Sequence, residues 1–282
     1  MANYDVLITE RNNSSTLHID RMNALEIAHA INEEDKRVAF AVETVLDAVA
    51  QTIDQTAAAL QNGGRLIYIG AGTSGRLGVM DAAECPPTYG VSPDCVIGLM
   101  IGGEAAVFHA QENREDDSLA GVNALRGVNL TARDVCVGIS ASGSAPAVVA
   151  ALQYAGDVGA VTVALTCNPG SDLTKCAQIG ISPVVGPEVI QGSTRMKSAT
   201  AHKMILNMIS TGAMIRIGRV RGNYMVHIRA KNVKALHRAH RIFQAVTGAD
   251  ESTASAMLDQ AGGDLSHAIA LYEGAAGADR LS

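Results

Sequence analysis

A glycine-rich turn after an apolar run is the first feature of this sequence that could do chemistry. Residues 70–75, GAGTSG, match the pattern G-x-G-x-x-G, in which glycines let backbone amides approach a phosphate group. A dinucleotide site would also need an acidic side chain about 20 residues further on, at the end of the second strand. That strand, CVIGLM, is followed by Ile101-Gly102-Gly103, and the first acid, Glu104, lies too far along. The turn is therefore predicted to bind a compact phosphate, and no cofactor is expected.

Hydroxyl side chains gather in three loops of the chain. Backbone N–H groups at a helix N-terminus, together with hydroxyl donors, suit a phosphate. A hydroxyl in any one loop could equally be only a helix N-cap, but three such loops in one sheet favour a ligand site. The hydroxyl residues predicted to bind the substrate are Thr73, Ser74, Ser140, Ser142, Ser193 and Thr194.

Two carboxylates stand apart as candidates for proton transfer. Glu84 precedes Cys85-Pro86-Pro87, and the prolines are expected to end the helix there and leave this carboxylate at a chain reversal. Glu115 is expected within a helix that starts near Glu104, in a run of acidic residues. A buried carboxylate among like charges keeps its proton to a higher pH, as a general acid or base near neutral pH requires. The alternative for Glu115 is that it belongs to a solvated acidic face.

The cations, histidines and cysteines indicate less specific chemistry. His237 and His240 lie three residues apart on a basic helix without a third ligand, so no metal site is expected. The five cysteines contain no C-x-x-C, and their odd number indicates neither a disulfide framework nor a zinc knuckle. Four cations lie near the hydroxyl loops, and each by itself is explained as a surface charge: Arg76, Arg195, Lys197 and Lys203.

The bulk composition is typical of a globular enzyme. The 282 residues are enough to bury a full core, and 48% of them are hydrophobic. Because the formal net charge is −6, there is no electrostatic reason to expect a nucleic-acid partner. The N-terminus lacks the basic and apolar regions of a signal peptide, and no apolar run approaches the ~18 residues of a membrane helix. We expect a cytoplasmic protein whose partner is a small molecule, not a membrane or nucleic acid.

Apolar runs alternate with helical patterns along the middle of the chain. Strands are expected at residues 65–69, 95–100, 134–139, 160–165 and 179–185, with helices after the first four. This alternation is typical of a doubly wound, mainly parallel sheet with helices on both faces. In such a sheet the loops at the carboxyl ends of the strands lie together. The α/β fold would therefore bring the hydroxyl loops side by side.

Three long motifs make this sequence similar to a known family. They are GRLIYIGAGTSGRLGVMDAAECPPTYG, ENREDD and GPEVIQGSTRMKSATAHKMILNM, which begin at residues 64, 112 and 186. With the N-terminal LITERNNSSTLHID and the helical tail, they resemble the N-acetylmuramic acid 6-phosphate etherase family, proteins with one SIS (sugar isomerase) domain. The resemblance implies an N-terminal polar segment with helices at 1–62, an SIS domain at 63–220 and a small helical region at 221–282.

The resemblance also implies an activity. It implies a cofactor-free, homodimeric, cytoplasmic lyase of peptidoglycan recycling with a shared active site. This lyase would cleave the D-lactyl ether of N-acetylmuramic acid 6-phosphate by β-elimination and water addition, giving N-acetylglucosamine 6-phosphate and D-lactate. Glu84 and Glu115 would be its two catalytic acid/base groups, in roles that could be exchanged. Glu188 would contact the sugar, although it could equally cap the following turn.

One loop departs from the family pattern and leaves alternatives open. Where the family usually has ASGRTPYV, residues 141–148 read ASGSAPAV, so an Arg, a Thr and a Tyr are replaced by Ser144, Ala145 and Ala147. That change puts in doubt a contact to the phosphate or the N-acetyl group. An aldose–ketose isomerase would need a base at C2 but no acid for a leaving group. A non-catalytic sugar-phosphate sensor would usually carry a further DNA-binding or sugar domain, for which the length leaves no room.

Overall fold

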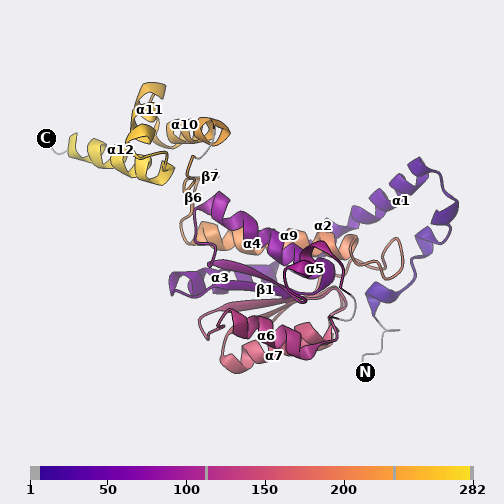
Figure 1. Ribbon diagram of the computed structural model, residues 1–282. Helices are drawn as coiled ribbons and strands as arrows, with labels where there is room; N and C mark the ends of the chain where they lie inside the picture. The colour runs from indigo at the N-terminus through magenta and orange to yellow at the C-terminus, as the bar shows by residue number, and fades with distance from the viewer. Residues whose placement is uncertain (1–6, 112–113, 231–232, 280–282) are drawn as a thin grey trace. The chain divides into compact units, whose positions relative to one another are not determined.

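The computed structural model describes residues 7–111, 114–230 and 233–279 (Figure 1). The described residues form two compact units. The first contains the chain up to Ala83 and Asp94–Ala213, and the second contains Glu84–Pro93 and the chain from Met214 onward. The division at residues 62/63 and 220/221 expected from the sequence stays a prediction.

A five-stranded parallel sheet forms the centre of the first unit. Its strands are β1 (Leu66–Gly70), β2 (Val96–Met100), β3 (Val135–Ile139), β4 (Val161–Leu165) and β5 (Ile179–Ile181). They lie in the order β2-β1-β3-β4-β5, and every neighbouring pair is parallel. Because the order reverses at β1, the loops after β1 and β3 face a common crevice at the carboxyl ends of the strands. The predicted doubly wound parallel fold is confirmed.

Helices cover both faces of this sheet (Figure 1). On one face α6 (Ser118–Gly127) and α7 (Pro146–Val158) pack on Ile67 and Ile69 of β1. On the other face α4 (Gly72–Tyr89) packs on Tyr68, whose hydroxyl donates a 2.9 Å hydrogen bond to Asp81. Alternate side chains of β1 therefore contact helices on opposite faces of the sheet, because successive side chains of a strand point to opposite faces.

The glycines of the GAGTSG turn let α4 lie close against β1. A Cβ placed on Gly75 would lie 2.3 Å from the carbonyl oxygen of Gly70, and one on Gly70 would lie 2.8 Å from the backbone nitrogen of Gly75. Both approaches are closer than a real side chain allows. These two glycines are therefore explained by packing between a helix and a strand, whatever ligand the turn binds.

Two further helices complete the layers of the first unit. Helix α3 (Leu46–Gln61) packs against β1, β3 and β5. Helix α9 (Lys197–Arg216) is joined to α4, because Asn207 and Ser210 donate hydrogen bonds of 2.6 and 3.2 Å to Asp81. The short helices α5 (Ala105–Phe108) and α8 (Asp172–Lys175) lie in the connections after β2 and β4.

The N-terminal part of the first unit runs as a series of short turns and then helices. It contains the 3-10 turns η2 (Ile8–Glu10), η3 (Ser14–Thr16) and η4 (Ile19–Arg21), followed by α1 (Ala24–Asp35) and α2 (Arg37–Glu43). A capping box begins α1, in which Asn23 accepts from the backbone of Glu26 and the Glu26 side chain accepts from the backbone of Asn23.

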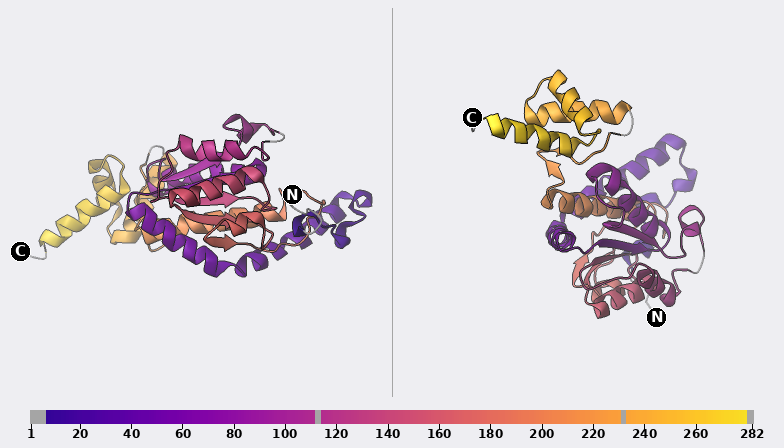
Figure 2. Two further views of the ribbon diagram at one scale, coloured as in Figure 1. Left: turned by 90° about the horizontal axis from the view of Figure 1, so that it is seen from below. Right: turned by 60° about the vertical axis from the view of Figure 1, so that its left-hand side comes forward.

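The second unit has its own small core. Helices α10 (Val233–Thr247), α11 (Glu251–Gln260) and α12 (Leu265–Asp279) form a three-helix group, shown in orange and yellow in Figure 2. Phe243 is fully buried there and meets Tyr272 edge to face, with ring centroids 5.6 Å apart. A hairpin of β6 (Val220–Arg221) and β7 (Tyr224–Met225) precedes them. This unit corresponds to the helical C-terminal region expected from the sequence.

The two prolines after Glu84 do not end their helix, and that expectation is wrong. Helix α4 continues through Pro86 and Pro87 to Tyr89, and Gly90 follows at a φ of +63°. The prolines remove two backbone hydrogen bonds. Burial of Cys85 and Tyr89 in the last turns offsets this loss, since both side chains are at most 9% exposed. Glu84 therefore lies on a helix, one turn after Asp81, and not at a chain reversal.

Candidate active site

A cavity of about 350 Å³ opens at the carboxyl ends of β1 and β3, within the first unit. Its lining residues fall into groups that come from different parts of the chain. One group, the sheet wall, consists of lining residues from 71–74 and 139–146. A second group, the strap wall, consists of Glu10, Gly192 and Thr194. The cavity brings together six residues singled out from the sequence: Thr73, Ser74, Glu115, Ser140, Ser142 and Thr194.

The sheet wall has the features of an anion site. Gly72 begins α4 and Pro146 begins α7, so the N-termini of two helices lie at the cavity. Such termini carry a partial positive charge that attracts phosphate. The hydroxyls of Ser140 and Ser142 lie 3.4 Å apart beside these termini. This wall can therefore bind a phosphate group without a metal ion.

Internal hydrogen bonds hold the β3–α7 loop in shape. Ser140 Oγ accepts from the backbone N–H of Gly143 at 3.1 Å, and Ser142 Oγ accepts from the hydroxyl of Ser144 at 2.9 Å. Gly143 has a φ of +70°, and a Cβ there would lie 2.2 Å from Ser171 Oγ. The three residues that replace larger family residues lie in or next to this wall, since Ser144 and Ala145 line the cavity and Ala147 begins the buried part of α7.

Glu115 lies in a turn before α6, and the expectation of one helix from Glu104 through Glu115 is wrong. Helix α5 ends at Phe108, and Asp117 begins a new helix by accepting hydrogen bonds from Leu119 and Ala120. Two helices replace one because Asp117 is a good N-cap. The carbonyl of Glu115 accepts a 2.9 Å hydrogen bond from Ala147, which ties this turn to the start of α7. The Glu115 side chain is exposed in the single chain, so its carboxylate is not buried there.

Glu84 is exposed and does not belong to the described residues that line this cavity. The buried side chain of Asp81, one turn earlier on α4, accepts from Tyr68, Asn207 and Ser210. These bonds fix the rotation of α4 about its axis where the chain approaches Glu84.

Glu188 caps α9. Its carboxylate is fully buried and accepts hydrogen bonds from the backbone of Lys197 at 3.0 Å and from both the backbone and hydroxyl of Ser198. Both oxygens are therefore engaged at a helix N-terminus, where a negative charge is favourable. Glu188 and Ser193 do not line the cavity among the described residues, and the capping role that the sequence left open for Glu188 is the one observed.

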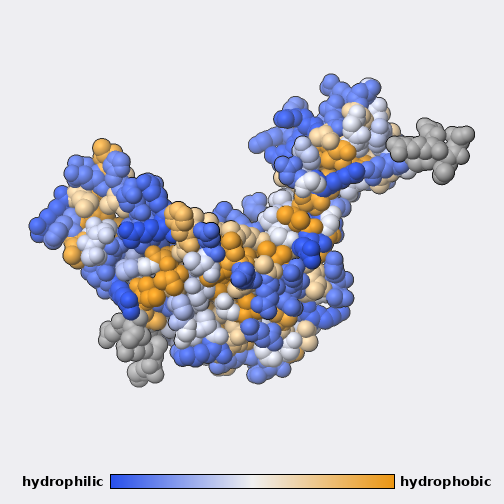
Figure 3. Space-filling view, turned by 180° about the vertical axis from the view of Figure 1, so that it is seen from behind, coloured by the Kyte–Doolittle hydropathy of each residue, from blue (hydrophilic) through white to orange (hydrophobic). Residues whose placement is uncertain are grey.

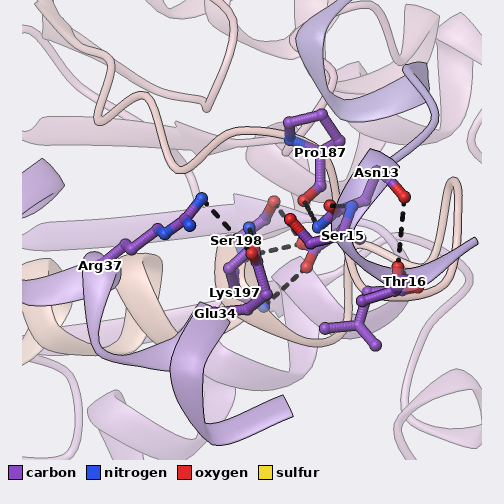
Figure 4. A network of polar contacts seen from close by, with 10 residues as sticks. Asn13, Ser15, Thr16, Glu34, Arg37, Pro187, Lys197 and Ser198 are labelled. Atoms are coloured by element: carbon purple, nitrogen blue, oxygen red, sulfur yellow. Dashed lines mark hydrogen bonds and ion pairs between the residues drawn. The ribbon is translucent and has the colours of Figure 1, made fainter. Parts of the chain in front are cut away.

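A buried ion pair joins α1 to the start of α9 (Figure 4). Lys197 is fully buried and bonds to Glu34, and Glu34 is also 3.3 Å from Arg37. Burial alone would raise the pKa of Glu34, but the hydrogen bond and charge of Lys197 bring that pKa below its usual value. Lys197 is thus a structural cation and not the surface charge expected from the sequence.

Arg76 is also engaged by the protein. Its guanidinium donates to the carbonyls of Val107 and Ala106, at 2.7 and 2.9 Å. It thereby ties α4 to α5.

Two acidic residues of the cavity were missed as site residues in the sequence. Asp116 was noted only as a neighbour of Glu115, and Glu10 only as part of the motif LITERNN. No local pattern indicates that Glu10 meets loops more than 60 residues away, so spacing could not have found it.

The structure offers no metal site and no membrane span in the part it describes. No three His, Cys, Asp or Glu side chains within the described ranges are grouped so that they could hold a metal ion. No helix in these ranges has the length and apolar character needed to cross a bilayer. Burial raises the pKa of the Cys136 and Cys167 thiols to about 12, which keeps both unreactive.

Three family models match parts of the chain. Residues 48–156 match the glucokinase regulatory protein N-terminal SIS domain, and residues 125–210 match the SIS domain. Residues 242–272, within the three-helix group, match a UBA-like domain.

Among curated proteins, similarity extends over about nineteen-twentieths of the chain. A Clostridium botulinum (strain Loch Maree / Type A3) protein named N-acetylmuramic acid 6-phosphate etherase is 50% identical over 269 residues, which are 95% of this chain and 89% of that one. A Serratia proteamaculans (strain 568) protein of the same name is 51% identical over 95% of this chain and 90% of its own. A Vibrio cholerae protein named N-acetylmuramic acid 6-phosphate etherase 2 is 50% identical over 94% and 87%.

Solved structures show the fold alone. A phosphoheptose isomerase from Francisella tularensis superimposes with a TM-score of 0.55, at 19% identity, over 68% of this chain and 98% of that one. A phosphoheptose isomerase from Neisseria gonorrhoeae gives 0.54, at 19% identity, over 67% and 98%.

Proposed function

This chain belongs to the N-acetylmuramic acid 6-phosphate etherase family, and from that membership we propose that it cleaves the D-lactyl ether of N-acetylmuramic acid 6-phosphate. The products are N-acetylglucosamine 6-phosphate and D-lactate. The observation that carries this proposal is an identity of about one half along nearly the entire chain. A cytoplasmic location is part of the same proposal, as the family resemblance implies.

The sheet wall supports a phosphate-binding role. We propose that Thr73, Ser74, Ser140 and Ser142 bind the phosphate, because their hydroxyl groups lie at or near the N-termini of α4 and α7. Thr194, from the strap wall, lines the same cavity. Ser193 and Glu188 act through the shape of the loop before α9, since the carboxylate of Glu188 is fully engaged there.

The reaction needs two proton-carrying groups and no metal. When the sugar ring opens, an aldehyde forms at C1 and acidifies the proton at C2. A base removes that proton, the lactyl group leaves C3 as its oxygen is protonated, and water then adds to C3. A positioned carboxyl group can carry out each of these proton transfers. Each one contributes ~10²–10⁴-fold to the rate.

Glu115 is the proposed base at C2, and Glu84 is the proposed acid for the departing lactate. Glu115 is supported by its place in the lining of the phosphate cavity. Glu84 is supported by the AAECPP motif that this chain shares with the family pattern. A leaving-group acid distinguishes elimination from aldose–ketose isomerisation, which needs only the base.

A homodimer with a shared active site is the proposed assembly. Support comes from large apolar side chains that the N-terminal helices leave in solvent: Leu25 of α1 is 68% exposed and Phe40 of α2 is 70% exposed. Figure 3 shows hydrophobic residues, in orange, gathered in patches on one face of the molecule. Exposed apolar surface can serve as an interface with another chain. Light scattering should therefore give about twice the mass of the chain, and a monomer that is fully active would contradict the shared site.

The test of the function is a product assay in labelled water. Incubation with N-acetylmuramic acid 6-phosphate should release D-lactate. In heavy water the sugar product should gain deuterium at C2, and in ¹⁸O-water it should gain the label at C3. Label in the lactate would refute elimination, and a ketose product without lactate would indicate an isomerase.

A further inference from the structure

One carboxylate of the cavity comes from a segment far from the sheet in sequence. Glu10, the last residue of η2, lines the cavity together with the acidic turn of Glu115 and Asp116. A Cβ placed on Gly192 would lie 3.2 Å from Glu10 Oε2. The carboxylate of Glu10 therefore passes directly over residue 192, where glycine leaves it room.

The backbone around Glu10 is fixed by polar contacts, one of which is fully buried. Asn168, which is 3% exposed, accepts from the N–H of Ile8 at 2.6 Å and donates to the fully buried hydroxyl of Thr9 at 3.1 Å. The side chain of Gln191 donates to the carbonyl of Glu10 at 2.8 Å. Position 10 is thus held from both sides, so the place of its carboxylate is set by the fold.

The contacts of Glu10 leave its carboxylate available to a ligand. In the ranges that the structure describes, the hydrogen bonds of Glu10 run through its backbone, whose N–H donates to the carbonyl of Leu7 and whose carbonyl accepts from Gln191, and its carboxylate receives no donor from the protein. An ionised carboxylate can only accept hydrogen bonds. A phosphate brings no donor when it is ionised and is repelled by a carboxylate, whereas sugar hydroxyl and amide groups bring donors.

We propose that the carboxylate of Glu10 accepts hydrogen bonds from O–H or N–H donors of the bound sugar and so selects which sugar phosphate the cavity holds. This inference rests on the proposed function for the substrate class. The helix N-termini and hydroxyls of the sheet wall take the phosphate, and Glu10 repels it, so the two walls together set one direction of binding. Glu10 is then a specificity-determining residue that recognises the part of the substrate the phosphate loops do not touch.

The test compares the binding of two ligands to the unchanged chain and to two variants. Binding of N-acetylglucosamine 6-phosphate and of inorganic phosphate is measured by calorimetry for the full chain, for Glu10→Gln and for Glu10→Asp. Because hydrogen bonds to a charged group are strong, we expect Glu10→Gln to weaken the binding of the sugar phosphate about tenfold to a hundredfold. Inorganic phosphate should bind as before or more tightly, since a repelling charge is gone. Glu10→Asp keeps the negative charge on a side chain that is one methylene shorter. Its affinity for the sugar phosphate should lie between those of the unchanged chain and of Glu10→Gln.

A matched control is Glu251→Gln, which changes an exposed glutamate in the first turn of α11. It should leave the affinities for both ligands unchanged. The proposal is overturned if Glu10→Gln changes the affinities for both ligands by the same factor or changes neither affinity. It is also overturned if the affinity for inorganic phosphate falls more than the affinity for the sugar phosphate. Binding is read out without turnover. A chain that binds both ligands as expected but releases no lactate would refute the proposed function and leave the role of Glu10 standing.

Discussion

The two walls of the cavity are built in different ways. The sheet wall is made of loops that directly follow β1 and β3, so its residues are near one another because neighbouring parallel strands end together. The strap wall is assembled from Glu10 and from residues just before α9, more than 180 positions apart in the chain. It is held by side-chain hydrogen bonds and by the buried pair of Lys197 and Glu34. The comparison teaches that local loops form the wall proposed to bind phosphate, while long-range polar contacts bring the remaining group of residues to the same cavity.

The largest expected effect concerns the acidic turn beside the sheet wall. Glu115→Gln should lower turnover by ~10²–10⁴-fold and stop exchange of the C2 proton with solvent, because it removes the proposed base. Glu84→Gln should retain the C2 exchange but slow lactate release. Exchange is followed by NMR in heavy water, with Glu104→Gln, another exposed glutamate of the same connection, as the control. The reverse pattern would exchange the two roles.

The next effect concerns the pair that secures the strap wall. Lys197→Met leaves Glu34 buried without its main partner, and removing one member of a buried pair costs about 3–5 kcal/mol. We expect a lower free energy of unfolding in urea and a raised KM with a smaller change in kcat. The double variant Glu34→Met with Lys197→Met should regain most of the stability. If the single variant unfolds like the wild type, the pair does not secure this wall.

A pH effect on stability is expected from His202 of α9, the helix that follows the strap wall. Burial lowers the pKa of His202 to about 4, and its Nε2 lies 3.5 Å from Sγ of Cys167, which follows β4. The folded chain binds this proton less readily than the unfolded chain, whose histidine has its usual pKa of 6.5. Stability should therefore fall as the pH drops from 6.5 toward 4, by about 3 kcal/mol in all from this group.

Urea unfolding at a series of pH values measures this slope. The carboxylate of Glu34, whose pKa is lowered, adds a loss of the same sign only below its usual value of 4.5. A stability that is level between pH 6.5 and 5 would show that His202 is not buried as a neutral ring.

The smallest expected effect concerns a glycine of the sheet wall. Gly143 and Gly170 both have positive φ, at +70° and +73°, but a Cβ would collide with Ser171 only at Gly143. Gly170→Ala should therefore cost about 1–2 kcal/mol for its left-handed backbone alone. Gly143→Ala should cost more and should also raise the Kd for inorganic phosphate, because it moves the loop of Ser140 and Ser142. Equal effects of the two changes on phosphate binding would contradict the rigidity of this loop.

Much of the sheet wall was readable in the sequence. Apolar runs and helical periodicity predicted five parallel strands, and the positions of Thr73, Ser74, Ser140 and Ser142 after those strands predicted that they would meet. Local patterns failed where packing decided the outcome. Pro86 and Pro87 were tolerated within α4 because neighbouring side chains are buried, and Asp117 started a new helix that left Glu115 in a turn.

The sequence by itself determined the family, the parallel sheet and the hydroxyl loops at the ends of its strands, because these depend on residue order and short-range periodicity. Only the tertiary structure decided that Lys197 is a buried partner of Glu34, that Glu188 caps a helix and that Glu10 reaches the cavity. Those three outcomes depend on which distant segments share a buried, low-dielectric space. Polar groups in such a space must find partners, and the spacing of residues along the chain does not say which partners those are.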